Sequence, residues 1–228
     1  MRFLGNVLAT VIGIFVFMML SFFGIILIGV IFGGDSETVE VENNSVIELN
    51  LSDISDDYAG KYSDPWVTAF SERKKIGLTD VINAIEIAET DDAIKGISIL
   101  NTNSSLGIAQ SKELRDALNR FKKSGKFIYS YANNYSQKEY YLNSVATSIY
   151  INPIGELDFK GLSTEVMFFK DFQEKSGLKM EVIRHGKYKS AVEPFLENKM
   201  SDANKEQTMA LLNGIWTNIV EDISKSRN

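Results

Sequence analysis

The chain has 228 residues and a formal net charge of −6, with 30 acidic residues, 24 basic residues and no cysteine. The lack of cysteine excludes a disulfide scaffold, a thiolate nucleophile and a cysteine-based zinc site in this chain. Its basic residues are scattered through an acidic sequence, a distribution that does not suggest a nucleic-acid partner.

A long apolar segment comes first along the chain. No charged residue occurs from Phe3 to Gly34, and about twenty apolar residues are enough to span a bilayer core as a helix. A secretory signal peptide has a shorter apolar region that ends at a small-residue cleavage site, and this segment has no such site. We therefore expect residues 1–34 to form an uncleaved transmembrane anchor.

The charges that flank this apolar segment differ in sign. Arg2 and the amino terminus precede it, and four acidic residues follow it: Asp35, Glu37, Glu40 and Glu42. We expect a single-pass protein of the inner (cytoplasmic) membrane, and the positive-inside rule predicts its orientation. Its N-terminus would lie in the cytoplasm and its domain on the outer, periplasmic face.

Residues 35–77 form the second expected region, which is mostly irregular. It starts with a polar tether over residues 35–44. Apolar and polar residues then alternate over residues 46–51, which is typical of a half-buried strand. Turn-forming and charged residues fill positions 52–77, where we expect a long irregular segment.

The third expected region, residues 78–228, alternates helical and strand patterns. Helices are predicted at residues 79–89, 109–123, 137–145, 167–174 and 201–224, and strands at 94–100, 127–131, 148–151 and 179–184. Thr79 should cap the first helix, and Gly125 should end the second. This alternation predicts an α/β domain of stacked βαβ units with a largely parallel sheet. No glycine-rich phosphate-binding motif follows any of the strands.

The single histidine limits the chemistry that this chain could perform. A histidine-dependent triad would have to use His185, and a zinc site would need further ligands with histidine-type spacing, which the sequence lacks. We interpret His185 as a residue at the end of a strand, beside Arg184 and Gly186. No metal and no organic cofactor are expected.

A lysine is the other side chain that can act as the base for a serine nucleophile. Its pKa is ordinarily near 10.4, and burial can lower that value until the neutral amine is available. Such a lysine needs a partly apolar setting without a bound carboxylate. Lys189, which follows a predicted strand end and Gly186, is the candidate, and a solvated loop lysine is the alternative interpretation.

The segment GKYKSAVEPF, residues 186–195, resembles the lysine segment of the signal peptide peptidase A (SppA, protease IV) family in its long, two-repeat form. Further matching positions occur in the same order along the chain: Tyr135–Gln137, Tyr140–Leu142, Asn152, Pro153, Gly155, Gly161, Leu162, Phe168–Lys170, Met200 and Ser201. The resemblance implies a ClpP/crotonase-like spiral of βαβ units after one transmembrane helix. It also implies a serine endopeptidase that degrades cleaved signal peptides or other membrane-associated peptides, assembles as a ring- or dome-shaped homo-oligomer, and uses Lys189 as its general base.

The resemblance does not supply a nucleophile with the same clarity. In the long form the second repeat carries the serine, so we expect this chain to lack it. In the short form the serine starts a helix before the lysine, and the position that matches is Ser136. The turn from Ser136 to Glu139 is not rich in glycine, so close backbone approach to a substrate would be hindered. We therefore interpret Ser136 as a helix cap.

The loop after the first core strand is where this family tends to have a glycine pair and where such folds often supply an oxyanion donor. Gly107 is the candidate donor here, whereas Ser104 and Ser105 are expected to form a turn. The alternative to a peptidase is a catalytically inactive short paralogue that acts as a membrane scaffold or regulatory partner. A second repeat encoded after Asn228 would distinguish the two interpretations.

Overall fold

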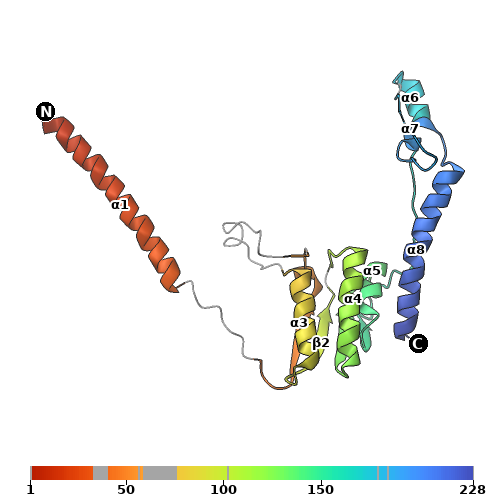
Figure 1. Cartoon of the computed structure of the whole chain (residues 1–228), viewed down its shortest axis with the longest axis horizontal. Coiled ribbons are helices and arrows are strands. Elements are labelled where there is room, and N and C mark those ends of the chain that lie inside the picture. Colours follow the sequence, from red (N-terminus) through yellow and green to blue (C-terminus); the bar gives the residue numbers. More distant parts are fainter. Residues whose placement is uncertain are drawn as a thin grey trace. The chain divides into compact units, whose positions relative to one another are not determined.

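The computed structural model describes residues 2–32, 41–55, 57–58, 76–101, 103–178, 180–183 and 185–227. It contains two compact units, Met1–Val41 and Glu42–Asn228 (Figure 1). Most of the predicted tether, and residues 59–75 of the predicted irregular segment, lie outside the described residues.

The first unit contains helix α1, Arg2–Phe32. Its first 27 residues, Arg2–Ile28, have a mean hydropathy of 2.9, and the described side chains are exposed around the helix. At a rise of about 1.5 Å per residue this stretch exceeds the roughly 30 Å hydrocarbon core of a bilayer. By length and composition, α1 is therefore a candidate membrane span.

The second unit is built on a four-stranded parallel sheet with the strand order β1-β2-β3-β4. The strands are β1 Ser45–Asn50, β2 Ile94–Leu100, β3 Phe127–Ala132 and β4 Ser148–Ile151. The helices that connect them are α3 Leu78–Thr90, α4 Ile108–Lys123 and α5 Gln137–Asn143. The predicted series of βαβ units with a parallel sheet is confirmed.

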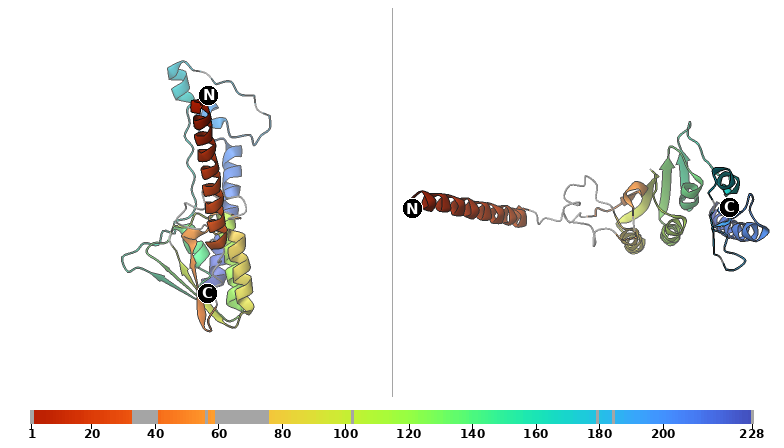
Figure 2. Two further views of the ribbon diagram at one scale, coloured as in Figure 1. Left: turned by 90° about the vertical axis from the view of Figure 1, so that its left-hand side faces the viewer. Right: turned by 90° about the horizontal axis from the view of Figure 1, so that it is seen from above.

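Side chains alternate between the two faces of the sheet, and one face forms the core. In β3, Ile128, Ser130 and Ala132 are buried, whereas Tyr129 and Tyr131 are exposed. Helix α4 packs against both α3 and α5, and Figure 2 shows the ends of α3 and α4 together on one side of the strands. The sheet and these helices enclose the apolar core, to which the segments after β1 and β2 add Leu51, Ile54 and Leu106.

Each predicted helix differs from the observed one at one or both ends, by one to three residues. Helix α3 starts at Leu78 with Gly77 as its N-cap, so Thr79 lies inside the helix, where its backbone N–H donates to the Asp57 carbonyl (3.1 Å). Helix α5 ends at Asn143, two residues earlier than predicted. The predicted stop after α4 is confirmed, because Gly125 takes a φ of 88°, which favours glycine.

After the sheet the chain forms three more helices: α6 Lys170–Ser176, α7 Glu193–Leu196 and α8 Asp202–Arg227. The predicted strand at 179–184 is wrong, because its described residues, 180–183, are not in a strand. A strand requires a neighbour for its backbone groups, and residues 180–183 pair with none of the four strands. His185 therefore does not lie at a strand end; it is exposed in a loop.

Candidate active site

Lys189 lies in a tight turn between α6 and α7. Gly186 has a φ of 106°, a left-handed conformation that glycine adopts without strain, and its carbonyl accepts the Lys189 backbone N–H (3.4 Å). The Lys189 side chain is exposed. The turn thus presents the predicted base at the surface of the second unit.

Lys189 borders a cavity of about 600 Å³ between this turn and the first half of α8. The residues that line it are His185, Gly186, Lys187, Tyr188, Lys189, Glu206, Gln207 and Ala210. Within the described part of the chain, the Lys189 ammonium makes no ion pair. The sequence-based requirement that no carboxylate be bound to the base is therefore met, whereas burial of the amine is not seen in this chain.

Lys187 has the same charge and lies two residues away, but its surroundings differ. Its Nζ lies 3.4 Å from the Tyr188 hydroxyl, 5.0 Å from the centre of the Tyr188 ring and 3.9 Å from Glu206 Oε2. The hydrogen bond to Tyr188 and the charge of Glu206 raise the pKa of Lys187. A raised pKa favours the ammonium form, which is the opposite of what a general base requires.

A buried carboxylate connects the lysine segment to the start of α8. Glu193, the first residue of α7, is buried and accepts hydrogen bonds from the Ser201 hydroxyl, the Ser201 N–H (3.2 Å) and the Asn204 amide (2.8 Å). Three donors satisfy a charge that would otherwise be costly to bury. Sequence reasoning did not assign Glu193 a role, although it lies inside the segment that carries the family resemblance.

The helix-cap interpretation of Ser136 is confirmed. The Ser136 hydroxyl accepts the Glu139 N–H (3.4 Å) and donates to Glu139 Oε2 (2.8 Å), while the Ser136 N–H donates to the same oxygen (3.0 Å). This reciprocal arrangement is a capping box at the start of α5. No described hydrogen bond joins Ser136 to Lys189, and Ser136 does not line the cavity beside Lys189.

Gly107 is the N-cap of α4, and its backbone N–H donates to Gln110 Oε1 (2.8 Å). That side chain would have to move before the N–H could stabilise an oxyanion. Ser104 and Ser105 were predicted to form a turn, but they lie in an irregular loop before α4. The Ser104 hydroxyl accepts the Leu106 N–H (3.4 Å), and the Ser105 hydroxyl donates to the Ile54 carbonyl (3.1 Å).

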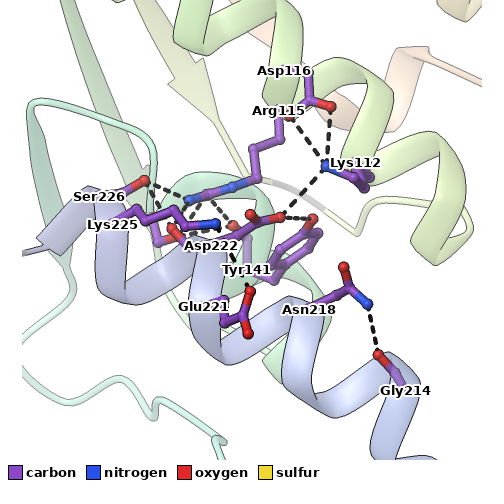
Figure 3. A network of polar contacts seen from close by, with 11 residues as sticks. Lys112, Arg115, Asp116, Tyr141, Gly214, Asn218, Glu221, Asp222, Lys225 and Ser226 are labelled. Carbon is purple, nitrogen blue, oxygen red and sulfur yellow. Dashed lines mark hydrogen bonds and ion pairs between the residues drawn. The ribbon is translucent and has the colours of Figure 1, made fainter.

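A buried arginine, which sequence reasoning missed, attaches the end of α8 to the sheet domain, by which we mean strands β1–β4 with helices α3–α5 (Figure 3). Arg115 on α4 donates to the Tyr141 carbonyl (2.6 Å), the Ser144 hydroxyl (2.6 Å), the Asp222 carbonyl (2.7 Å) and the Ser226 hydroxyl (2.6 Å). Burial lowers the pKa of the Arg115 guanidinium, and the neighbouring Tyr141 and Asp222 act in the opposite direction. An arginine keeps its proton in such a site. The charged guanidinium of Arg115 on α4 therefore joins this helix to α5 and α8.

Two side chains complete the Arg115 cluster. The Tyr141 hydroxyl donates to Asp222 Oδ2 (2.9 Å), and Lys112 Nζ lies 3.6 Å from the same oxygen. Burial raises the pKa of the Tyr141 hydroxyl, and its hydrogen bond to Asp222 adds to this effect. None of these groups borders the cavity beside Lys189, so their role is to position α8. In the described part of the chain, no group of three or more histidine or acidic residues could hold a metal ion.

Residues 120–228 match the family described as "Peptidase family S49". The chain is 37% identical over 205 residues to "Protease 4" of Haemophilus influenzae, an alignment that covers 86% of this chain and 33% of that protein. It is 33% identical over 184 residues to "Serine protease SPPA, chloroplastic" of Arabidopsis thaliana, covering 81% of this chain and 26% of that protein.

A similar match, 36% identical over 152 residues, is found with "Protease 4" of Salmonella typhi and covers 66% of this chain and 24% of that protein. The chain therefore spans between about a quarter and a third of the length of these relatives. The parallel sheet of βαβ units agrees with the ClpP-like fold of peptidase family S49. The chain belongs to this family, the SppA/protease IV family of peptidases.

Proposed function

We propose that this chain is the lysine-bearing part of a membrane-bound serine endopeptidase with a serine-lysine dyad, in which Lys189 is the general base. One observation carries the proposal. The Lys189 side chain is free of ion pairs among the described residues and borders a cavity, in the segment that resembles the lysine segment of the family. Lys187, two residues away, is paired with Glu206, and this difference between the two lysines of the turn supports the choice of Lys189.

The proposed chemistry requires a neutral Lys189. The amine takes the proton of the serine hydroxyl as the hydroxyl oxygen attacks the scissile carbonyl carbon, and later returns that proton to the leaving amine nitrogen. Because Lys189 is exposed in this chain, we propose that a further part of the enzyme covers it, lowers its pKa by desolvation and supplies the serine. The Ser136 hydroxyl is already engaged with Glu139, which supports a serine outside these residues.

The substrates that we propose are cleaved signal peptides and other membrane-associated peptides. Helix α1 supports this choice, because a candidate membrane span would keep the second unit close to such peptides. We further propose the inner membrane as the location, with the N-terminus inside, and assembly of the complete enzyme as a ring- or dome-shaped homo-oligomer. The family resemblance supports the assembly.

The test of the base uses the complete enzyme that contains this segment. Lys189→Ala should abolish turnover of a signal-peptide substrate while the protein still folds and assembles. Lys189→Arg should be nearly as damaging, because guanidinium does not give up its proton at a working pH. Lys187→Ala is the matched control and should retain most of the activity. Peptidase assays of the three variants, with size-exclusion profiles to check folding, provide the comparison.

Near-normal activity of Lys189→Arg would refute the base assignment, because only a positive charge would then be needed. The same holds if Lys187→Ala proves the more harmful change. An inactive scaffold or regulatory partner is the second candidate function, and the engagement of Ser136 as a helix cap favours it for this chain alone. Full turnover by the chain itself, abolished by Ser136→Ala, would contradict both candidates.

The membrane orientation has its own test. Arg2 is the first residue of α1, and four acidic residues follow the apolar segment: Asp35, Glu37, Glu40 and Glu42. A reporter that is active only after export, fused after Asn228, should therefore be active. Activity of a cytoplasm-specific reporter at the same position would reverse the proposed topology.

A further inference from the structure

A second cavity lies at the carboxyl ends of β2 and β3, and it shares no lining residue with the cavity beside Lys189. Its volume is about 400 Å³. The residues that line it are Leu100, Asn101, Asn103, Tyr131, Ala132, Asn133, Asn134 and Glu139. Four asparagines and one glutamate are among these residues, and none of them has a part in the chemistry proposed for Lys189.

A buried hydrogen-bond chain determines which atom of Asn101 is available in this cavity. The Glu139 carbonyl can only accept, so the atom of Asn143 that contacts it at 2.8 Å is the amide nitrogen. The same nitrogen donates to Asn101 Oδ1 (2.8 Å), and Asn143 Oδ1 accepts the Ser130 hydroxyl (2.8 Å). The Asn101 side-chain oxygen is therefore occupied by a hydrogen bond from Asn143, and the Asn101 amide nitrogen remains available to donate to a ligand.

This amide nitrogen is an unused donor on a nearly buried residue. Asn101 is 6% exposed, and among the described residues its Nδ2 donates to no protein acceptor. The side-chain atoms that are fully enclosed without a partner in the described structure are Glu89 Oε1 and Ser111 Oγ, so Asn101 Nδ2 is not sealed inside. Because Asn101 lines the cavity, the donor is accessible from there.

The remaining lining residues indicate what this donor could bind. Glu139 places a carboxylate in the wall, where it accepts hydrogen bonds from Ser136 and Ser104. Its negative charge disfavours an anionic ligand and favours a neutral acceptor. Tyr131 is 44% exposed, with its hydroxyl donating to Asn133 Oδ1 (3.2 Å), so its ring offers an apolar surface beside the donor. These residues would fit a ligand with a neutral carbonyl next to an apolar group. An apolar peptide has both, in its main-chain carbonyls and its side chains.

We propose that this cavity is a non-catalytic peptide-binding site, in which Asn101 Nδ2 donates to a main-chain carbonyl of an extended peptide. The ring of Tyr131 packs against the neighbouring peptide side chain. The inference rests on the proposed function, because it takes a peptide as the natural ligand, and it adds a contact outside the Lys189 site. Such a site holds the substrate without taking part in bond cleavage.

The test measures binding without turnover. The full chain in detergent micelles is titrated into a fluorescent leucine- and alanine-rich peptide that is acetylated at its N-terminus and amidated at its C-terminus, and fluorescence anisotropy is followed. Asn101→Asp replaces the donor with an acceptor of the same shape and should weaken binding by about two- to tenfold, the equivalent of one hydrogen bond. Tyr131→Ala, which alters a half-exposed ring and leaves the buried chain intact, should also weaken binding.

Tyr150→Ala is the matched control. Tyr150 pairs with Tyr131 in the sheet register and is 55% exposed, but it does not line the cavity, so its loss should leave binding unchanged. Wild-type affinity in both Asn101→Asp and Tyr131→Ala would overturn the inference, as would an equal loss in Tyr150→Ala. Tighter binding of the same peptide with a free C-terminal carboxylate would show an anion site and would also overturn it. None of these results depends on the Lys189 variants, so a failure here is distinguishable from a failure of the proposed function.

Discussion

Replacing Arg115 with alanine should detach the end of α8 from the sheet domain. Arg115 is 1% exposed and joins the Tyr141 carbonyl and the Ser144 hydroxyl of the sheet domain to Asp222 and Ser226 of α8. Its guanidinium also lies 5.1 Å from the centre of the Tyr141 ring. These contacts join α4 to residues more than a hundred positions later in the chain.

The expected loss follows from what the deletion leaves behind. The Tyr141 carbonyl would still accept the Ser144 hydroxyl (2.9 Å), and the Asp222 carbonyl would still accept the Ser226 hydroxyl (3.1 Å), so neither is left without a donor. The main cost is the space vacated by a large buried side chain, typically about 2–5 kcal/mol. Four charge-assisted bonds are also lost, but the desolvation cost of the ion, several kcal/mol, is recovered. We expect a net loss of about 3 kcal/mol in the free energy of unfolding.

Arg120 on the same helix provides the control. Its side chain is 48% exposed and lies 2.6 Å from Glu86, so Arg120→Ala should cost no more than about 1 kcal/mol. Urea unfolding of the full chain in micelles gives the free energies, and hydrogen exchange of the α8 amides shows whether that helix loosens. A loss in Arg115→Ala no larger than in Arg120→Ala, or unchanged protection of α8, would refute the positioning role.

Two further predictions concern α5. Ser136→Ala should lower the free energy of unfolding by about 1 kcal/mol through loss of the cap, and should leave the peptidase activity of the complete enzyme intact; abolished turnover would identify Ser136 as the nucleophile. Burial raises the pKa of Tyr141, so its neutral form stabilises the fold fully below about pH 10, the ordinary tyrosine value, and this contribution is lost as the pH rises further. The melting temperature should therefore fall more steeply above about pH 10 in the wild type than in Tyr141→Phe. Parallel pH profiles of the melting temperature for the two proteins would contradict the assignment.

Much of the fold follows from local patterns. The sequence predicted strands β2, β3 and β4 and helices α4 and α5 to within a few residues. Apolar residues alternate in a half-buried strand and recur every three to four residues in a helix, so their spacing indicates which face each segment buries. The predicted strand at 179–184 failed for the complementary reason. Its apolar residues suit a strand, but a strand exists only when a neighbour satisfies its backbone, and no local pattern reports that neighbour.

The candidate site was predicted in part. Lys189 came from the resemblance of its segment. The cap at Ser136 was inferred because the turn from Ser136 to Glu139 lacks the glycines that close approach to a substrate requires. The capped N–H of Gly107 was not anticipated, because its acceptor, Gln110, had no assigned role. Whether Lys189 is the base stays a prediction until the variants are measured.

By itself, the sequence determined the apolar α1 segment, the order of the βαβ units and the location of the lysine segment. Each of these depends on residues close together in the chain, where composition and spacing act directly. Only the tertiary structure decided where the side chains of Arg115, Glu193 and Asn101 lie and what they contact. A polar side chain is buried when distant partners satisfy its hydrogen bonds, and the Asp222 carbonyl that Arg115 reaches is 107 residues away. Such partners are brought together by packing, which no local pattern of residues encodes.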